Sequence, residues 1–167
     1  MSIIFETERL FVKELILGDL TLFHKMQSNY NVMRFVRGKA MTYDENKQEL
    51  ENLIKKYTEK ENDFWIFAVK IKLNNIFLGT VAVVNDGEDD EIGYRLLEEH
   101  WGCGYGYEVS KGLIEYCKAQ KINKIVAYAA LDNIASTKIL KKLNFTFVKN
   151  LIAEDLGIPE RKFELIL

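Results

Sequence analysis

The chain has 167 residues, 48% hydrophobic and 29% charged, which predicts one globular domain over residues 1–167. Its formal net charge of −2 offers no basic face for duplex nucleic acid and is compatible with a cationic amine substrate. The chain has two cysteines and two histidines, which indicate no disulfide framework and no metal site. Because no signal segment and no apolar run of membrane-spanning length is visible, we expect a cytoplasmic protein with no membrane partner.

The first third of the chain is expected to supply one strand and two helices. Glu8 to Leu15 reads as a short strand, and Asp19 can cap the helix that follows. Residues 30–41 are ambiguous, and their apolar side chains could pack over a site. Thr42-Tyr-Asp-Glu45 has the spacing of a capping box, which predicts a helix over residues 42–60.

Three strands are predicted in the middle of the chain. Phe64 to Ile71 and Ile76 to Val84 are apolar runs joined by Asn74-Asn75, which predicts an antiparallel hairpin. Asn85-Asp86-Gly87 predicts a second turn. Glu91 to Leu97 then completes a meander.

A glycine-rich loop and a crossover follow the meander. The helix predicted over 107–120 and the strand over 124–131 give a strand, helix, strand unit, which is typical of a right-handed crossover between parallel strands. Asn133 begins a short helix that ends near Leu143, and Asn144 can take the left-handed conformation that ends it. The last strands are Phe145 to Val148 and Arg161 to Leu167, so the fold class is α+β with a mixed sheet.

Three alternating glycines, Gly102, Gly104 and Gly106, form this loop. Glycine lets a ligand approach the backbone closely, and the free N–H groups at the start of a helix favour an anion such as phosphate. The loop lacks the Lys-Ser/Thr ending of nucleoside-triphosphate loops. It also lacks the G-x-G-x-x-G spacing of dinucleotide sites, and the next carboxylate, Asp132, lies beyond the following strand. The loop therefore predicts a phosphate-bearing ligand of another class, with a plain glycine turn as the alternative.

Four segments in this order resemble a known family. They are Ile92-Gly-Tyr94, Trp101-Gly-Cys-Gly-Tyr-Gly-Tyr-Glu108, Asn133-Ile-Ala-Ser136 and Leu140-Lys-Lys-Leu-Asn-Phe145, and the opening Thr7-Glu-Arg-Leu10 agrees with them. Together they resemble the GNAT superfamily of acetyl-CoA-dependent N-acetyltransferases, and within it the RimJ/RimL-like branch of ribosomal-protein N-terminal acetyltransferases. The resemblance spans about Phe5 to Leu167. It implies the acyl-CoA N-acyltransferase fold, a central mixed but mostly antiparallel sheet flanked by helices.

The resemblance also implies where the co-substrate acetyl-CoA would bind. Backbone N–H groups of the glycine loop would hold the diphosphate of coenzyme A, and the preceding strand would pair with the pantetheine arm by strand addition. Trp101 departs from the broad pattern of the superfamily but is usual in the RimJ/RimL-like branch. The residues implied in acetyl-CoA binding are Tyr94, Arg95, Leu96, Leu97, Trp101, Gly102, Cys103, Gly104, Tyr105, Gly106, Tyr107, Asn133 and Ser136.

Acetyl transfer requires a neutral amine, and deprotonating a lysine-like amine at neutral pH costs about 4–5 kcal/mol. Glu91 is the candidate base, although the acidic run around it also reads as a solvated turn. Many family members have a tyrosine as general acid four residues after the position of Ser136, where this chain has Leu140. The resemblance therefore leaves protonation of the departing thiolate to Ser136, to a nearby tyrosine such as Tyr128, or to water. Glu91 and Ser136 are the expected catalytic residues, with no metal.

We expect an N-acetyltransferase that moves the acetyl group of acetyl-CoA to a primary amine by direct attack in a ternary complex. The acceptor could be a protein N-terminus or a small amine, and Arg34 or Arg37 could meet an acceptor carboxylate. The alternative is a non-catalytic acyl-CoA-binding sensor, which the missing tyrosine favours and the candidate base opposes. The oligomeric state stays open, and a homodimer is compatible with the resemblance.

Overall fold

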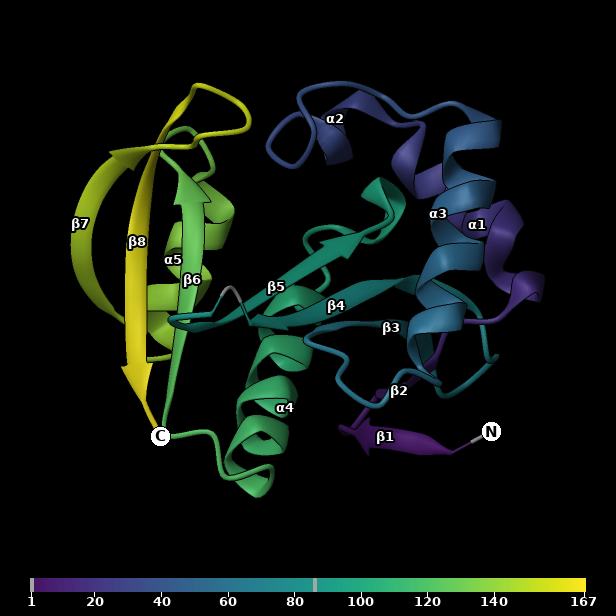
Figure 1. Ribbon diagram of the computed structural model, residues 1–167, viewed down its shortest axis with the longest axis horizontal. Coiled ribbons are helices and arrows are strands. Elements are labelled where there is room, and N and C mark those ends of the chain that lie inside the picture. The colour runs from purple at the N-terminus through teal and green to yellow at the C-terminus, as the bar shows by residue number, and fades with distance from the viewer. Residues whose placement is uncertain (1, 86) are drawn as a thin grey trace.

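Figure 1 shows a computed structural model of the chain, which describes residues 2–85 and 87–167. Within these residues the centre is one eight-stranded sheet in the order β1-β2-β3-β4-β5-β6-β8-β7. Its neighbouring strands are antiparallel except β5 and β6, which are parallel. The predicted α+β fold with a mixed, mostly antiparallel sheet is confirmed. The strands are β1 (Ile3–Glu6), β2 (Leu10–Glu14), β3 (Phe64–Ile71), β4 (Phe77–Asn85), β5 (Asp90–Leu96), β6 (Lys124–Ala130), β7 (Thr146–Ile152) and β8 (Pro159–Ile166).

Helices cover both faces of the sheet, so the central strands are buried on both sides (Figure 1). In β3, Phe67 and Val69 belong to the apolar cluster under α4, whereas Ile66 and Ala68 belong to the cluster under α1 and α3. This alternation follows from the two-residue period of a strand. In the described residues no helix is long and apolar enough to cross a membrane. The helices are η1 (Leu17–Asp19), α1 (Leu20–Gln27), α2 (Tyr30–Met33), α3 (Tyr43–Lys56), η2 (Glu98–His100), α4 (Tyr105–Ala119) and α5 (Ile134–Lys142).

Most predicted elements are confirmed close to their predicted bounds. The side chains of Thr42 and Glu45 form the predicted capping box, although α3 ends at Lys56 rather than residue 60. Asn144 has the predicted left-handed conformation, with φ 65°. The Asn133 side chain caps α5 by accepting a hydrogen bond from the backbone N–H of residue 136. The predicted crossover is also present, because α4 connects the parallel strands β5 and β6.

The N-terminal region differs from the prediction. The predicted strand over 8–15 is β2, and a further strand, β1, pairs with it. Asp19 is the N-cap residue of α1 as predicted, but its carboxylate makes no hydrogen bond to the backbone of that helix. Instead it pairs with Lys70 of β3 at 2.5 Å and accepts from the backbone N–H of Ile16 at 3.1 Å. A buried ion pair to a distant strand therefore takes the place of the local cap.

The predicted turn at Asn85-Asp86-Gly87 falls partly outside the described residues, which do not include Asp86. The Oδ1 atom of Asn85 accepts a hydrogen bond from the backbone N–H of Gly87 at 2.8 Å. Asn85 is the last residue of β4, and its side chain also forms a hydrogen bond with Gly87 after the turn.

The parallel strands β5 and β6 pair at only two positions, Asp90 with Ile125 and Glu91 with Val126. Beyond them the two arrows separate in Figure 1, which leaves a gap inside the sheet.

Asp89 lies at the closed end of this gap, within 2.6 Å of the Lys124 ammonium and 2.5 Å of the Lys162 ammonium. Hydrogen bonds from these two lysines lower the pKa of Asp89. One carboxylate therefore joins the end of β5 to β6 and β8 where the gap begins.

Candidate active site

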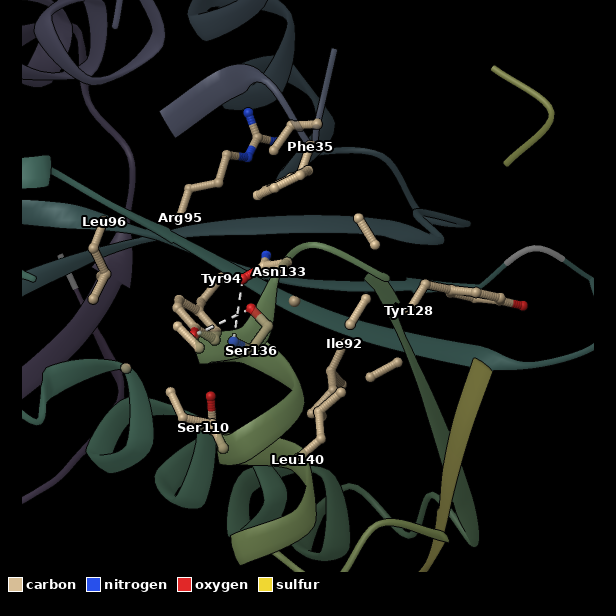
Figure 2. A pocket seen from close by; sticks show the side chains of 18 of the residues that line it. Phe35, Ile92, Tyr94, Arg95, Leu96, Ser110, Tyr128, Asn133, Ser136 and Leu140 are labelled. Atoms are coloured by element: carbon tan, nitrogen blue, oxygen red, sulfur yellow. Dashed lines mark hydrogen bonds between the residues drawn. The ribbon is translucent and has the colours of Figure 1, made fainter. Parts of the chain in front are cut away.

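A cavity with a volume of about 1330 Å³ lies where β5 and β6 separate. Its walls come from β5, the glycine loop, the start of α4, β6 and the start of α5, and from residues 31–36 and 151–156. Figure 2 shows Tyr94 of β5 beside Asn133 and Ser136 of α5, while Tyr128 points away from this group. The predicted catalytic and cofactor segments, distant in sequence, therefore meet at one cavity.

The glycine loop enters α4 through two left-handed residues. Gly102 has φ 74° and Gly104 has φ 83°, a region that L side chains adopt only with strain. Gly104 is the N-cap of α4, and the helix begins at Tyr105, earlier than the predicted Tyr107. N–H groups in the first turn of a helix have no partner within the helix and favour a phosphate. This backbone suits the predicted diphosphate-binding role.

Arg9 does not line the cavity but lies beside the glycine loop, a contact that the motifs did not predict. Its Nε lies 2.6 Å from Glu108 Oε2, its Nη1 donates to the Cys103 carbonyl at 3.1 Å, and its guanidinium lies 4.3 Å from the ring centre of Tyr105. Burial raises the pKa of Glu108, but hydrogen bonds from Thr7 and Arg9 outweigh it and lower the pKa overall. Arg9 thus ties the loop to β2 and neutralises the carboxylate in the first turn of α4.

Alternate residues of β5 turn their backbone groups toward β4. The N–H of Leu97 donates to the Leu78 carbonyl at 2.9 Å. The Arg95 carbonyl lies so close to Gly79 that a Cβ built there would approach it to 2.0 Å. Arg95 and Leu97 therefore face β4, although they were expected to pair with pantetheine.

The intervening residues of β5 present their backbone to the gap, because successive residues alternate between the two edges of a strand. The N–H and C=O groups of Tyr94 and the N–H of Leu96 lie on this edge. The Leu96 carbonyl already accepts a hydrogen bond from Trp101 Nε1 at 3.0 Å. Trp101 thereby connects the glycine loop to β5, and the rest of the edge suits an extended amide chain such as pantetheine.

Two hydroxyl groups from different elements meet in the cavity. The Tyr94 hydroxyl lies 3.4 Å from Ser136 Oγ, and the Tyr94 ring packs so closely on Gly106 that a Cβ there would lie 3.1 Å from Cε2. Burial raises the pKa of Tyr94 more than the Ser136 hydrogen bond lowers it. Asn133 Oδ1 accepts from the Ser136 N–H at 3.2 Å. Leu140 is a buried core residue, so the phenol nearest to Ser136 comes from β5 rather than from α5.

The opposite face of β5 carries Glu91, Gly93 and Arg95, which line the cavity toward residues 31–36. We call this part the acceptor side. Glu160 also lines the cavity, and burial, followed by the charge of Asp155, raises the pKa of Glu160. Motif reasoning missed Glu160, because the last strand was predicted to begin one residue later.

Leu97 and Cys103 are the predicted acetyl-CoA residues that do not line the cavity. The Leu97 side chain packs in the cluster under α1 and α3. Cys103 is exposed, and its thiol donates to the Trp101 carbonyl at 3.6 Å. The other residues predicted for acetyl-CoA binding line the cavity, as does Glu91. Of the two arginines considered for an acceptor carboxylate, Arg34 lines the cavity and Arg37 does not.

Comparison with known proteins gives consistent findings. A family model described as the acetyltransferase (GNAT) domain matches residues 9–146. The uncharacterized N-acetyltransferase YoaA of Bacillus subtilis strain 168 is 26% identical over 147 residues, which cover 85% of this chain and 82% of that protein. A GNAT-family acetyltransferase structure from Bacillus anthracis has a TM-score of 0.84 at 17% identity and covers 97% of both chains. RimL, a ribosomal L7/L12 alpha-N-protein acetyltransferase solved in complex with coenzyme A, has a TM-score of 0.82 at 15% identity, covering 99% of this chain and 98% of that one.

Proposed function

The chain belongs to the GNAT acetyltransferase family, which uses acetyl-CoA, and on that premise we propose that it acetylates a primary amine by direct transfer. The amine attacks the thioester of acetyl-CoA in a ternary complex, with no covalent enzyme intermediate. The proposal rests on one observation: beyond Glu91, the side of β5 that faces β6 has no strand among the described residues paired with it. This edge lies between the glycine loop and the Tyr94–Ser136 pair, so a phosphate site, an amide-pairing edge and proton donors share one cavity.

The proposed binding mode follows the polar groups of the cavity. The first-turn N–H groups of α4 hold the diphosphate, and the free edge of β5 pairs with the amides of pantetheine. Lys138 and Lys142 of α5 also line the cavity, and their positive charges would attract the phosphate groups of acetyl-CoA. The Lys142 ammonium lies 4.1 Å from the ring centre of Tyr107, at the start of α4.

In the proposed reaction, Glu91 first accepts a proton from the substrate ammonium, directly or through a water, which gives the neutral amine that attacks. The neutral nitrogen forms a bond to the thioester carbon, and the N–H of Tyr94 on the free edge stabilises the resulting oxyanion. Collapse of the intermediate breaks the carbon–sulfur bond. The Tyr94 hydroxyl, with Ser136 beside it, gives a proton to the departing sulfur. The nitrogen gives up its second proton, which restores the Tyr94 phenol directly or through a water. The products are an amide and the coenzyme A thiol, and the one proton left on Glu91 passes to solvent.

Two acceptor classes are compatible with this chemistry. The likeness in fold to RimL makes a protein N-terminus one candidate, and a small amine is the other. The alternative function, a non-catalytic acyl-CoA-binding sensor, gains no support from the site, since a hydroxyl pair and a carboxylate line the same cavity.

The proposal is tested by thermal unfolding with acetyl-CoA, followed by measurement of thiol release with a panel of amines. Saturating acetyl-CoA is expected to raise the unfolding temperature by about 5–10 °C, and at least one amine is expected to release thiol. A thermal shift without turnover would favour the sensor. No shift would refute the assigned cofactor site.

A further inference from the structure

The side chain of Arg95 lies on the acceptor side of the cavity, beside Phe35 (Figure 2). Its Nη1 donates to Oε1 of Gln27, which is fully buried. The Gln27 amide nitrogen donates in turn to Asn46 at 2.9 Å and to Glu49 at 3.1 Å. These two bonds fix the amide oxygen toward Arg95. A buried polar network therefore holds the guanidinium in one position at the wall of the cavity.

Arg95 makes no ion pair within residues 2–85 and 87–167, whereas the nearby Arg37 pairs with Glu49 at 3.3 Å. A guanidinium has five N–H donors, and the bond to Gln27 uses one of them. Burial lowers the pKa of Arg95, the negative charge of Glu49 raises it, and the positive charge of Arg37 lowers it further. Arg95 is a partly buried cation that makes no direct ion pair within the described residues, while Glu49 is already paired with Arg37, so the site favours an additional anionic ligand.

Acidic groups line other parts of the same cavity. Glu91 lies on the same face of β5 as Arg95, and Asp155 and Glu160 also line the cavity. Gly93 lies between Glu91 and Arg95, and a Cβ built on it would meet nothing within 4 Å. Glu91 and Arg95 are four residues apart, which corresponds to about 13 Å along a strand, with Gly93 midway between them. The acceptor side therefore has open space between an anionic and a cationic group, which suits an ammonium at one end and a carboxylate at the other.

Contacts across the acceptor side limit the size of its ligand. Asn29 and Asn31 both donate to the carboxylate of Glu98 in η2. Gly38 lies next to Leu156, since a Cβ on Gly38 would be 3.3 Å from Leu156 Cδ2. In Figure 1 the loop after α2 and the loop between β7 and β8 approach each other above the gap. An extended polypeptide would have to displace these contacts, and a small molecule would not.

We propose that the acceptor is a small amine that also carries a carboxylate, and that Arg95 binds this carboxylate while the amine lies over Gly93 near Glu91. The proposal rests on the acetyltransferase function proposed above and names its substrate class. A planar guanidinium matches a carboxylate through two parallel hydrogen bonds. The second negative charge of a phosphate would be repelled by the acidic groups of the cavity. Arg95 is thus a specificity-determining residue.

The test compares ω-amino acids with alkylamines of the same chain length, using thiol release from acetyl-CoA by the full chain. The ω-amino acids are expected to have a kcat/KM roughly 100-fold above the matched alkylamines, with an optimum at one chain length because Arg95 is fixed. In Arg95→Gln the ratio of kcat/KM for ω-amino acids to that for alkylamines should fall to near one, and Arg95→Lys should recover part of it. Arg161→Gln is the control, since it removes an arginine of β8 that does not line this cavity.

Each result bears on the proposal. Equal turnover of ω-amino acids and alkylamines by the unchanged chain would overturn it and leave the acetyltransferase function standing. Turnover confined to a peptide N-terminus would overturn it in favour of a protein acceptor. No thiol release with any amine would contradict both proposals. The comparison within the unchanged chain keeps the proposal falsifiable even if Arg95→Gln fails to fold.

Discussion

The hydroxyl of Tyr94 on β5 lies 3.4 Å from the hydroxyl of Ser136 on α5. The two residues are brought together by the crossover through α4, on the cavity side of both elements. Because burial raises the pKa of Tyr94, its phenol stays protonated throughout the neutral range. The pair therefore provides a proton donor at a place where the apolar Leu140 cannot.

Replacing Tyr94 by phenylalanine is expected to lower kcat by about 100-fold, because the donor for the departing thiolate is lost. Affinity for acetyl-CoA should not change, since the ring that packs on Gly106 remains. Steady-state thiol release and thermal shift measure the two quantities. Ser136→Ala should give a smaller loss, and the double variant should be less than additive. Full turnover in Tyr94→Phe would exclude the phenol as the acid.

Replacing Glu91 by glutamine is expected to lower kcat/KM for amines by about 100-fold at neutral pH. The deficit should be largest at low pH, where the least amine is neutral, and should shrink as the pH approaches the pKa of the amine. Acetyl-CoA affinity should stay constant. Asp90→Asn is the control, because Asp90 accepts from the Asn85 side chain at 3.0 Å and does not line the cavity. If the two variants had the same pH–rate profile, Glu91 would have no role as a base and would be part of the solvated acidic turn only.

Replacing Gly104 by valine is expected to weaken acetyl-CoA binding by more than about tenfold. A side chain at φ 83° is strained by about 1–2 kcal/mol, and it would also obstruct a diphosphate at the start of α4. Gly157→Val is the matched control, with φ 64° and nothing within 4 Å of its Cβ. It should lose similar stability and keep its affinity for acetyl-CoA. Equal affinities in both variants would contradict the placement of the diphosphate.

Replacing Gly79 by alanine is expected to destabilise the protein by about 3 kcal/mol, because the new Cβ would lie 2.0 Å from the Arg95 carbonyl. Gly93→Ala should change the free energy of unfolding by less than about 0.5 kcal/mol, since its Cβ meets nothing within 4 Å. Urea unfolding of both variants measures the difference. A small effect at Gly79 would show that β4 and β5 can move apart at this point.

Replacing Glu160 by glutamine is expected to stabilise the protein at neutral pH. Burial raises the pKa of Glu160 in the folded state, so its stabilising contribution is complete below the unfolded pKa and is lost as the pH rises through the folded pKa. The variant should match the unchanged chain below about pH 4 and exceed it at pH 7 by less than about 1 kcal/mol, since the group is partly exposed. Thermal unfolding across this range checks the sign. A lower unfolding temperature for the variant at pH 7 would contradict it.

The elements that local chemistry determines were predictable from the sequence. The apolar run of β3 and the capping box of α3 need no distant partner to be recognised. Asp19 is at the predicted N-cap, but its ion pair could not be predicted because the partner, Lys70, lies on a strand distant in sequence. The same limit applies at the cavity. Strand alternation predicts that Tyr94 and Arg95 point to opposite faces, but the partners Ser136 and Gln27 become visible only when the chain is folded.

β1 was missed for a related reason. It is short, and its pairing with β2 places it at the edge of the sheet. There α4 passes so close that a Cβ on Gly112 would lie 2.8 Å from the Phe5 ring. Packing against α4 is a tertiary property, and a strand of this length carries little periodicity of its own.

If acetyl-CoA pairs with the free edge of β5 as proposed, its binding would also stabilise the folded state. The backbone groups of β5 that face the gap would gain hydrogen-bond partners from the proposed pantetheine arm, which would then act as an added strand. Free acetyl-CoA at a hundred times its dissociation constant would add about 2.7 kcal/mol to the free energy of unfolding. When acetyl-CoA is scarce, more molecules would open and become accessible to proteases. We therefore expect the cellular abundance of this protein to follow the supply of its own co-substrate.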